Sequence, residues 1–278
     1  MEALLAQRRR IRSPVAAGMF YPEDRNETLM SIKSFGLEAG GGGQARAIIA
    51  PHGAWSYSGA LVASAFFSAM GRSGGIKRVV VLGPIHDKRE KGLFLSNSHS
   101  FHTPLGNITV DRKISKEIEQ VGRYFEVDDI PHLGEHSIEI LLPFVKYCFP
   151  RASIVPILMG QADAQYIHDL AKALKTVITP VLDETLIVVS CNLSCDNDSQ
   201  TARLSAEKCL RLFSAKNAPA LASAIVDGQL NACGCALVAS LFESGLIDRT
   251  QVHFAEDKMV SAVGVENNTV YYSDVSFV

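Results

Sequence analysis

The sequence predicts an α/β fold of three layers, a sandwich with helices packed on both faces of a largely parallel or mixed central sheet. Apolar runs that fit buried strands alternate with stretches of helical spacing over most of the 278 residues. Several of these runs are continuously apolar, as expected of parallel strands that are covered on both faces. The composition does not change along the chain and no internal repeat is found, so we expect one domain over residues 1–278.

The expected strands are short and rich in β-branched and aliphatic residues. The first must end at Pro51, which has no amide hydrogen to donate to a sheet. Another is expected to tolerate Pro156 within it. In chain order, the expected strands lie at 47–50, 77–82, 93–96, 107–111, 153–159, 185–190, 251–254, 259–264 and 269–272.

The expected helices have apolar residues three and four positions apart and, in several cases, a capping residue at the start. Ser58 is expected to cap a helix that begins near Gly59, and Asp163 to cap one that runs to about Ile178. Glu135 is expected to open another helix, where the helix dipole favours an acidic side chain. The glycine run 40–43 is expected to be a flexible surface loop. In chain order, the expected helices lie at 26–37, 59–70, 113–121, from 135 onward, 163–178, 200–214, 219–227 and 232–244.

Composition argues against several classes of function. The formal net charge is −2, which offers no strong attraction to nucleic acid or anionic lipid. No apolar run is long enough to span a bilayer, and the basic run 8–12 follows a short apolar segment instead of preceding it, unlike a secretory signal. We therefore expect a cytoplasmic protein that binds neither nucleic acid nor membrane, with its six cysteines reduced.

Histidines stand just beyond the ends of two expected strands. His52 follows the strand 47–50 and Pro51, and His86 follows the strand 77–82 and Pro84. Open α/β sheets bind their ligands at the carboxyl ends of their strands, so His52 and His86 are candidates for a shared site. Taken alone, His52 is equally well explained as a residue that hydrogen-bonds a turn.

An ordered set of motifs over nearly the whole chain resembles the MEMO family, whose fold is related to the class III extradiol (LigB-like) dioxygenases. The chain is thus identified as a single MEMO-like domain. The matching segments are 17–22, 50–52 with Tyr57 and Gly59, 82–86, 103–106, 135–139 and 233–234.

The resemblance implies a metal pocket built from His52, His86 and Cys233. In the related dioxygenases, two histidines and a glutamate hold non-haem iron at the corresponding positions, and such a facial set leaves coordination positions open for oxygen and substrate. The implied cofactor is Fe(II), with copper or zinc as alternatives, and the implied role is metal-dependent redox chemistry. The implied partners are a small molecule or a peptide, and a radical SAM protein of the same gene set.

The sequence departs from the family pattern beside this pocket. The segment 190–195 reads Ser-Cys-Asn-Leu-Ser-Cys where the family has Ser-Ser-Asp-Phe-x-His. Asn192 thus replaces an aspartate, and Cys195 replaces a histidine that resembles the dioxygenase base, so both are candidate catalytic positions. Without a base whose pKa is near neutral, ring-cleaving activity is expected to be weak.

The cysteines gained near the pocket leave two interpretations open. Cys191, Cys195 and Cys235 are expected on loops next to it, and Cys195 could complete a closed set with two histidines and Cys233, which prefers zinc. Alternatively, these thiols are packed in the core, where free cysteine is often found.

Three further residues are candidates for contact with the substrate. Trp55 and Tyr57 are expected to line the mouth of the pocket and stack a ligand, with core packing as the alternative. His136 is the third candidate for substrate contact. We expect it to hydrogen-bond the loop that carries His86 rather than to bind metal.

Three functions are compatible with these residues. The first is a metal-dependent oxidoreductase of the dioxygenase type. The second is a non-catalytic binding or scaffold protein that keeps the pocket but has lost the base. The third, which ranks last, is a Cys233 nucleophile activated by His52 or His86.

Overall fold

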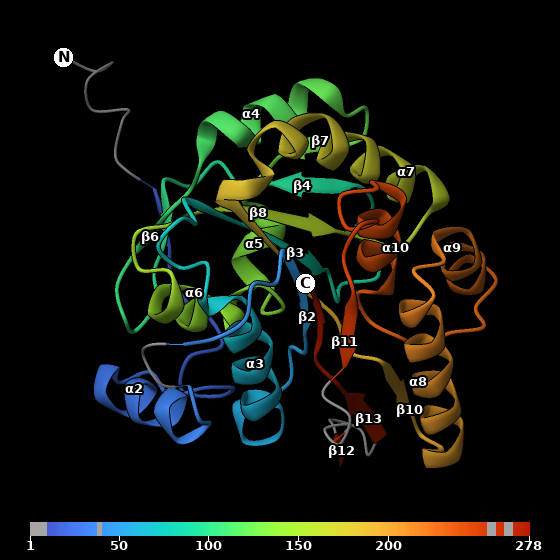
Figure 1. The fold of residues 1–278 in the computed structure, drawn as a ribbon, viewed down its shortest axis with the longest axis horizontal. Coiled ribbons are helices and arrows are strands. Elements are labelled where there is room, and N and C mark those ends of the chain that lie inside the picture. The colour runs from blue at the N-terminus through green and yellow to red at the C-terminus, as the bar shows by residue number, and fades with distance from the viewer. Residues whose placement is uncertain (1–9, 38–40, 255–259, 264–268) are drawn as a thin grey trace.

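The computed structural model describes residues 10–37, 41–254, 260–263 and 269–278. At its centre lies an eight-stranded mixed sheet (Figure 1). Four parallel strands form the middle of this sheet, and antiparallel pairings continue it on both sides. In spatial order, the strands are β11 (Val252–Phe254), β14 (Val275–Phe277), β2 (Ala47–Ala50), β9 (Thr185–Ser190), β3 (Arg78–Pro84), β8 (Ser153–Met159), β4 (Leu93–Leu95) and β7 (Phe125–Val127).

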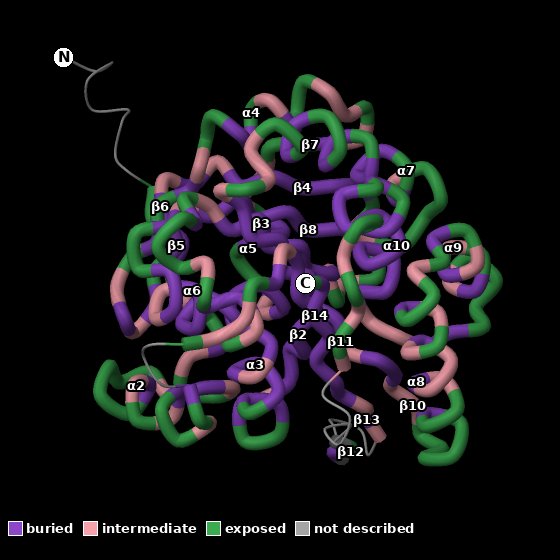
Figure 2. Tube along the Cα trace, in the orientation of Figure 1, coloured by how far each residue is buried: buried purple, intermediate pink, exposed green. Residues whose placement is uncertain are grey.

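Helices pack on both faces of this sheet (Figure 1). Alternate residues of a central strand enter opposite cores: Val80 and Leu82 lie in one, and Val79 and Val81 in the other. The middle strands are buried over almost their whole length (Figure 2). The predicted three-layer α/β fold with a mixed central sheet is confirmed. One face carries α2 (Arg25–Ser34), α3 (Trp55–Met70) and α6 (Leu142–Cys148), and the other carries α4 (Arg112–Val121), α7 (Ala164–Ala173), α8 (Ser199–Ser214), α9 (Ala218–Val226) and α10 (Cys235–Glu243).

Shorter elements surround this framework. Two three-stranded sheets flank it, and one of them reaches the candidate site described below. In the part of the chain that the structure describes, no helix is both long and apolar enough to cross a bilayer. The shorter elements are β1 (Ile11–Arg12), β5 (Ser100–Phe101) and β6 (Ile108–Thr109) in one sheet, β10 (Ser194–Asp196), β13 (Thr269–Tyr272) and β12 (Val260–Val263) in the other, and the helical turns α5 (Ile130–Gly134), η1 (Glu139–Leu141), η2 (Leu174–Ile178) and η3 (Thr179–Glu184).

The strands β2, β8 and β9 have the predicted bounds. Pro156 is tolerated within β8 because it falls between two paired segments on one side of the strand. On that side, Ile154 pairs with Val110, and β4 pairs with β8 only from Ile157 onward. The missing amide hydrogen of Pro156 therefore interrupts no continuous ladder on that side.

Two predicted helix starts are wrong. Helix α3 begins at Trp55 rather than near Gly59, and Ala54 precedes it in extended conformation without a capping side chain. Ser58 lies inside the helix, where its hydroxyl donates to the carbonyl of Gly53 at 2.8 Å. Glu135 does not open a helix: it ends α5 in extended conformation, and the next helical turn starts at Glu139.

The described part of the glycine run is held against α3 by hydrogen bonds, and its predicted flexibility stays a prediction. The amide of Gly43 donates to the carbonyl of Phe67, and the amide of Gly71 donates back to Gly43. A Cβ at Gly42 or Gly43 would clash with a backbone carbonyl of α3, so only glycine lets the loop pack this closely. Gly40 of this predicted loop, and residues 259 and 264 of the predicted strand 259–264, lie outside the described residues.

Candidate metal centre

The structure brings His52, His86 and Cys233 together. One ligand atom from each of these residues lies within 4.8 Å of those of the other two. His52 follows β2, and His86 follows β3, so both stand at the carboxyl ends of parallel strands. Cys233 precedes α10, and its carbonyl accepts a hydrogen bond from the amide of Asn192, which follows β9.

The ring of His52 is held so that one nitrogen is left free for a ligand. Ser190 donates its hydroxyl hydrogen to the carbonyl of Ser137 at 2.7 Å, so its oxygen must accept from Nδ1 of His52, 2.8 Å away. This fixes the hydrogen on Nδ1 and leaves a lone pair on Nε2. His52 is 1% exposed, and no described residue hydrogen-bonds its Nε2. Burial, with the charges of the neighbouring histidines, holds the pKa of His52 well below its usual value.

His86 is oriented by a buried carboxylate. Its Nδ1 donates to Glu135 at 2.9 Å, and its backbone amide donates to the same carboxylate at 2.7 Å. Its Nε2 therefore points the other way and lies 3.4 Å from Sγ of Cys233. Burial lowers the pKa of His86, but its hydrogen bonds to Cys233 and Glu135 outweigh that effect and raise it to about 10.

The carboxylate of Glu135 is taken up by hydrogen bonds, so it orients His86 rather than offering a free ligand atom. Besides His86, its carboxylate accepts from the amides of His136 and Ser137 at 2.8 and 2.7 Å. Burial raises the pKa of Glu135, but the hydrogen bonds and charge of His86 outweigh it and bring the pKa to about 2. Glu135 and His136 form a second close group with His86, yet the carboxylate oxygens of that group are already occupied. A carboxylate behind a ligating histidine is the usual support of a metal site.

The donor set fits a transition metal. Two imidazole nitrogens and one thiolate sulfur are ligands that iron, copper and zinc accept in proteins, and three protein ligands leave further coordination positions open. The unpartnered Nε2 of buried His52 is the strongest sign, because a buried polar atom normally has a partner.

His136 lies against the site through its ring. The ring stacks on that of His86 with centroids 4.5 Å apart, and Phe20 packs near it at 4.8 Å. The sequence missed Phe20, and it also missed Glu135 as the support of His86. His136 thus meets His86 through ring stacking rather than through the expected hydrogen bond to its loop, which Glu135 makes instead. Its role toward a substrate stays a prediction.

Trp55 and Tyr57 lie in different surroundings. Trp55 is 3% exposed, packs against Phe144 and Tyr21, and donates its indole hydrogen to the carbonyl of Ile140. Core packing therefore accounts for Trp55, because its ring does not reach an open pocket. Tyr57 is 50% exposed and stays a candidate for ligand contact.

Cys195 does not join the three-residue group in the described structure. It lies in β10, whose pairing with β13 carries Cys195 to a small apolar cluster with Leu61 and Tyr272. The closed set of two histidines and two cysteines is therefore not formed. Asn192 helps to hold the backbone of His52 in place, because its side-chain oxygen accepts from the amide of His52 at 3.0 Å.

Tyr272 is a neighbour of the site that the sequence did not indicate. A Cβ at Gly53 would lie 2.6 Å from its hydroxyl oxygen, so glycine beside His52 makes room for this tyrosine. Burial raises the pKa of Tyr272 to about 12, and the nearby Cys195 and Tyr57 add to this effect. The hydroxyl therefore keeps its proton at neutral pH.

Cys191 follows β9 directly and Cys235 is the first residue of α10, and the side chains of both pack in the core. Both are fully buried, and each thiol is in contact with a neighbouring one: Sγ of Cys235 lies 3.7 Å from those of Cys191 and Cys209. The contact with Cys235 and burial raise the pKa of Cys209. The contact with Cys191 and burial raise the pKa of Cys235, although the contact with Cys209 opposes them. These three cysteines are therefore neutral core residues, as the packing interpretation expects.

Comparisons with known proteins agree with the motifs. A "MEMO1 family protein" of Thermococcus onnurineus is 35% identical over 188 residues, which cover 65% of this chain and 64% of that protein. A "MEMO1 family protein" of Thermotoga neapolitana is 29% identical over 247 residues, which cover 84% of this chain and 88% of that protein. The matched region thus spans under two thirds of the first relative.

A solved structure, "Crystal structure of uncharacterized protein JW3007 from Escherichia coli K12", covers 82% of this chain and 98% of that chain with a TM-score of 0.47 and 9% identity. That likeness is too low to assign a fold family. In contrast, a family model described as "Memo-like protein" matches residues 12–272. The chain therefore belongs to the Memo-like protein family.

Proposed function

We propose that the chain binds a transition-metal ion through His52, His86 and Cys233 and uses it for redox chemistry of the extradiol-dioxygenase type. The observation that carries this proposal is the unpartnered Nε2 of buried His52, in a group of three residues whose ligand atoms lie within 4.8 Å of one another. We propose Fe(II) first, with copper or zinc as alternatives. The class III dioxygenase-like assignment of the fold belongs to the same proposal.

Each residue has a separate task in this site. A bound metal would supply Lewis-acid and redox chemistry to a substrate. Ser190 and Glu135 fix the two imidazoles so that each turns Nε2 toward the site. To hold a metal, His86 would offer an unprotonated Nε2 while its Nδ1 hydrogen stays hydrogen-bonded to Glu135, and Cys233 would offer a thiolate. His136 covers one face of the His86 ring, and Phe20 packs against His136.

A non-catalytic binding protein is the alternative. Cys195 stands at the position of the expected base, and a cysteine there offers no imidazole to act as that base. The ligand would then be a small molecule or a peptide, and a radical SAM protein is the partner proposed from the family resemblance. These partners rest on that resemblance alone.

The arrangement of Cys233, His86 and Glu135 also supports a nucleophilic cysteine. The thiol faces Nε2 of His86 at 3.4 Å, and Nδ1 of His86 faces Glu135 at 2.9 Å, as in a thiol–imidazole–carboxylate relay. A nucleophilic Cys233 would be alkylated quickly by iodoacetamide in the metal-free protein. Slow alkylation, no faster than that of half-buried Cys195, would exclude this function.

Metal analysis of protein purified anaerobically and without a histidine tag tests the main proposal. We expect about one metal per chain, and loss of it in His52→Ala, His86→Ala and Cys233→Ser. His253→Ala and Cys195→Ser are the matched controls, because these residues lie outside the three-residue group. If the wild type cannot be loaded with any of the three metals under reducing conditions, the metal function is wrong.

A further inference from the structure

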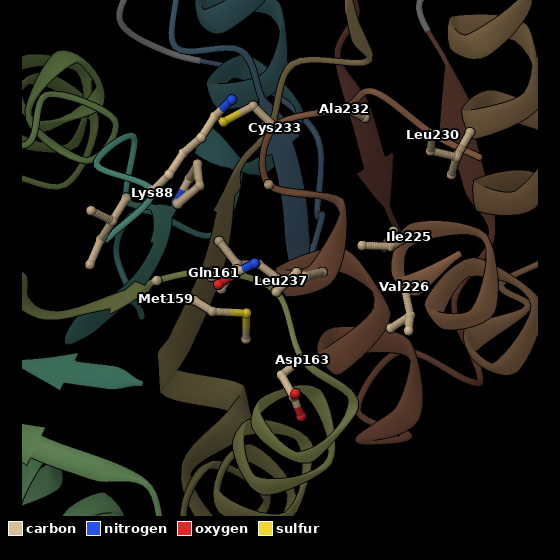
Figure 3. A pocket seen from close by; sticks show the side chains of 16 residues that line it. Lys88, Met159, Gln161, Asp163, Ile225, Val226, Leu230, Ala232, Cys233 and Leu237 are labelled. Carbon is tan, nitrogen blue, oxygen red and sulfur yellow. The ribbon is translucent and has the colours of Figure 1, made fainter. Parts of the chain in front are cut away.

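A second cavity adjoins Cys233, at the carboxyl ends of β3 and β8 (Figure 3). Its volume is about 500 Å³, within the range of about 300–1,000 Å³ that is usual for small-molecule sites. The residues that line it come from the ends of β3 and β8, from α9 and from the start of α10. They include Cys233 but neither His52 nor His86, so the cavity lies beside the metal group rather than within it.

The side chains in the body of the cavity are mostly aliphatic, with the amide of Gln161 as the polar group among them (Figure 3). Met159 and Leu237 form one wall, and Ile225, Val226 and Leu230 stand across from them (Figure 3). No aromatic side chain is among the lining residues. A flat ring would therefore find no stacking partner, whereas a flexible aliphatic chain gains by leaving water for these walls.

The end of the cavity near Cys233 carries positive charge. Lys88 lines this end, and Figure 3 shows its side chain extending toward Cys233. Among the described residues, Lys88 has no acidic partner, because the adjacent Asp87 is paired with Arg89 at 2.6 Å. The nine-residue helix α10 also begins here, after Gly234 and without a capping side chain, so the positive end of its dipole faces the same wall.

The opposite end carries the carboxylate of Asp163, which already caps helix α7. Asp163 lies away from Lys88 in Figure 3, and its side chain caps α7 by accepting from the amide of Gln165 at 2.7 Å. The cavity is thus positive at one end, largely aliphatic in the middle and negative at the other end. The carboxylate of Asp163 disfavours a second negative group at its end, so a ligand with one anionic end fits better than a dianion.

We propose that this cavity binds a small aliphatic monoanion, with its charged group at Lys88 and its chain between Met159 and Ile225. A single ammonium group and a single helix start match one negative charge better than two. The inference adds a ligand class to the proposed function, since the charged end would lie beside Cys233. The walls are formed by the chain itself, so binding in this cavity requires no metal.

Calorimetric titration of the metal-free protein tests the proposal, with octanoate as the probe and octanamide as its neutral match. Octanoate is expected to bind about two- to fivefold more tightly than octanamide, the usual worth of an exposed ion pair. Lys88→Ala should remove this advantage. Lys33→Ala, an exposed lysine on α2, is the control and should keep it.

Two further variants test whether the two probes bind in this cavity. Ala232 is half-buried in the loop that lines the cavity, and Val226 is exposed at its edge on α9. Ala232→Trp and Val226→Trp should each weaken both probes about tenfold or more, because an added indole fills the space. Val226→Trp changes a surface position, so it keeps the test valid if Ala232→Trp fails to fold.

His52→Ala separates this site from the metal site. This variant should lose metal and still bind octanoate like the wild type. Octanoate binding is thus tested independently of metal binding, and it is expected even if the protein binds no metal. Equal binding of octanoate and octanamide, the same loss in Lys33→Ala as in Lys88→Ala, or unchanged binding in both tryptophan variants would each overturn the proposal. Loss of octanoate binding in His52→Ala would also overturn it, since the probe would then lie at the metal group.

Discussion

Glu135 accepts hydrogen bonds from both the backbone amide and Nδ1 of His86. It thereby fixes the position of the loop and the orientation of the ring with one carboxylate. Replacement by alanine leaves the ring free to rotate and removes the acceptor that keeps the hydrogen on Nδ1. We expect Glu135→Ala to weaken metal binding by about 10–100-fold, the usual effect of losing such a support. Competition with a chromophoric chelator measures this change.

The control for this prediction is Glu126→Ala, which removes an exposed carboxylate from β7. It should leave the metal affinity unchanged. Equal affinities for Glu135→Ala and the wild type would show that the carboxylate does not position His86 for a metal.

The same pair predicts how the stability of the metal-free protein depends on pH. The pKa of Glu135 falls from 4.5 to about 2 on folding, so its contribution is present above pH 4.5 and is lost as the pH falls toward 2. The pKa of His86 rises from 6.5 to about 10, so its contribution is present below pH 6.5 and is lost as the pH rises toward 10. For this pair, stability is greatest between pH 4.5 and 6.5.

Urea unfolding of the metal-free protein at a series of pH values tests whether the free energy of unfolding falls below pH 4.5 and above pH 6.5. Glu135→Gln should reduce both of these decreases, because it removes the charge that His86 interacts with. A variant whose free energy of unfolding varies with pH as strongly as that of the wild type would contradict the assignment.

Arg12 links the N-terminal segment to the loop that carries Glu135. Its guanidinium is buried, pairs with the carboxylate of Glu139 and donates to the carbonyls of His132 and Glu135. Arg12→Met leaves the buried Glu139 without its counter-charge, and such a loss costs about 3–5 kcal/mol. We expect the free energy of unfolding in urea to fall by that amount.

Two comparisons complete the test of Arg12. Arg151→Ala, at an exposed position, should change the stability by less than about 0.5 kcal/mol. Arg12→Met combined with Glu139→Gln should recover part of the loss, since no charge is then left unpaired. A single variant as stable as the wild type would mean that the pair contributes nothing.

Local patterns were enough to predict most of the fold. The strands β2, β8 and β9 are uninterrupted apolar runs, so their bounds follow from the residues themselves. The strand β14 was missed because three residues carry too little pattern. The predicted helix start at Glu135 is wrong because the side chain of Glu135 hydrogen-bonds His86. His86 is far away in sequence, so helix propensity could not reveal this contact.

The site was predictable only in part. His52 and His86 stand at strand ends, and parallel strands deliver such positions to one edge of the sheet. Cys233 was reached only through the family resemblance, because nothing in its local sequence places it beside β3. Tyr272 and Cys195 could not be placed, since their positions depend on the pairing of β10 with β13.

Cys195 stands where the family has a histidine that resembles the dioxygenase base. The iron-loaded wild type should take up little oxygen with a catechol, because loss of a general base costs about two to four powers of ten in rate. Restoring the family residues with Cys195→His and Asn192→Asp should raise the oxygen uptake. The carboxylate introduced by Asn192→Asp would keep an acceptor for the amide of His52, so the metal site should survive the change.

Cys195→His alone and Asn192→Asp alone are the controls. They separate the effect of a base at residue 195 from the effect of residue 192, which accepts a hydrogen bond from the amide of His52. The single histidine variant should recover most of the activity, since residue 195 is the candidate base and Asn192 only accepts a backbone hydrogen bond. Rapid catechol cleavage by the unmodified protein would contradict the degenerate site. If the double variant binds iron but stays inactive, the small cluster of Leu61 and Tyr272 holds residue 195 away from the substrate, and the binding-protein alternative is favoured.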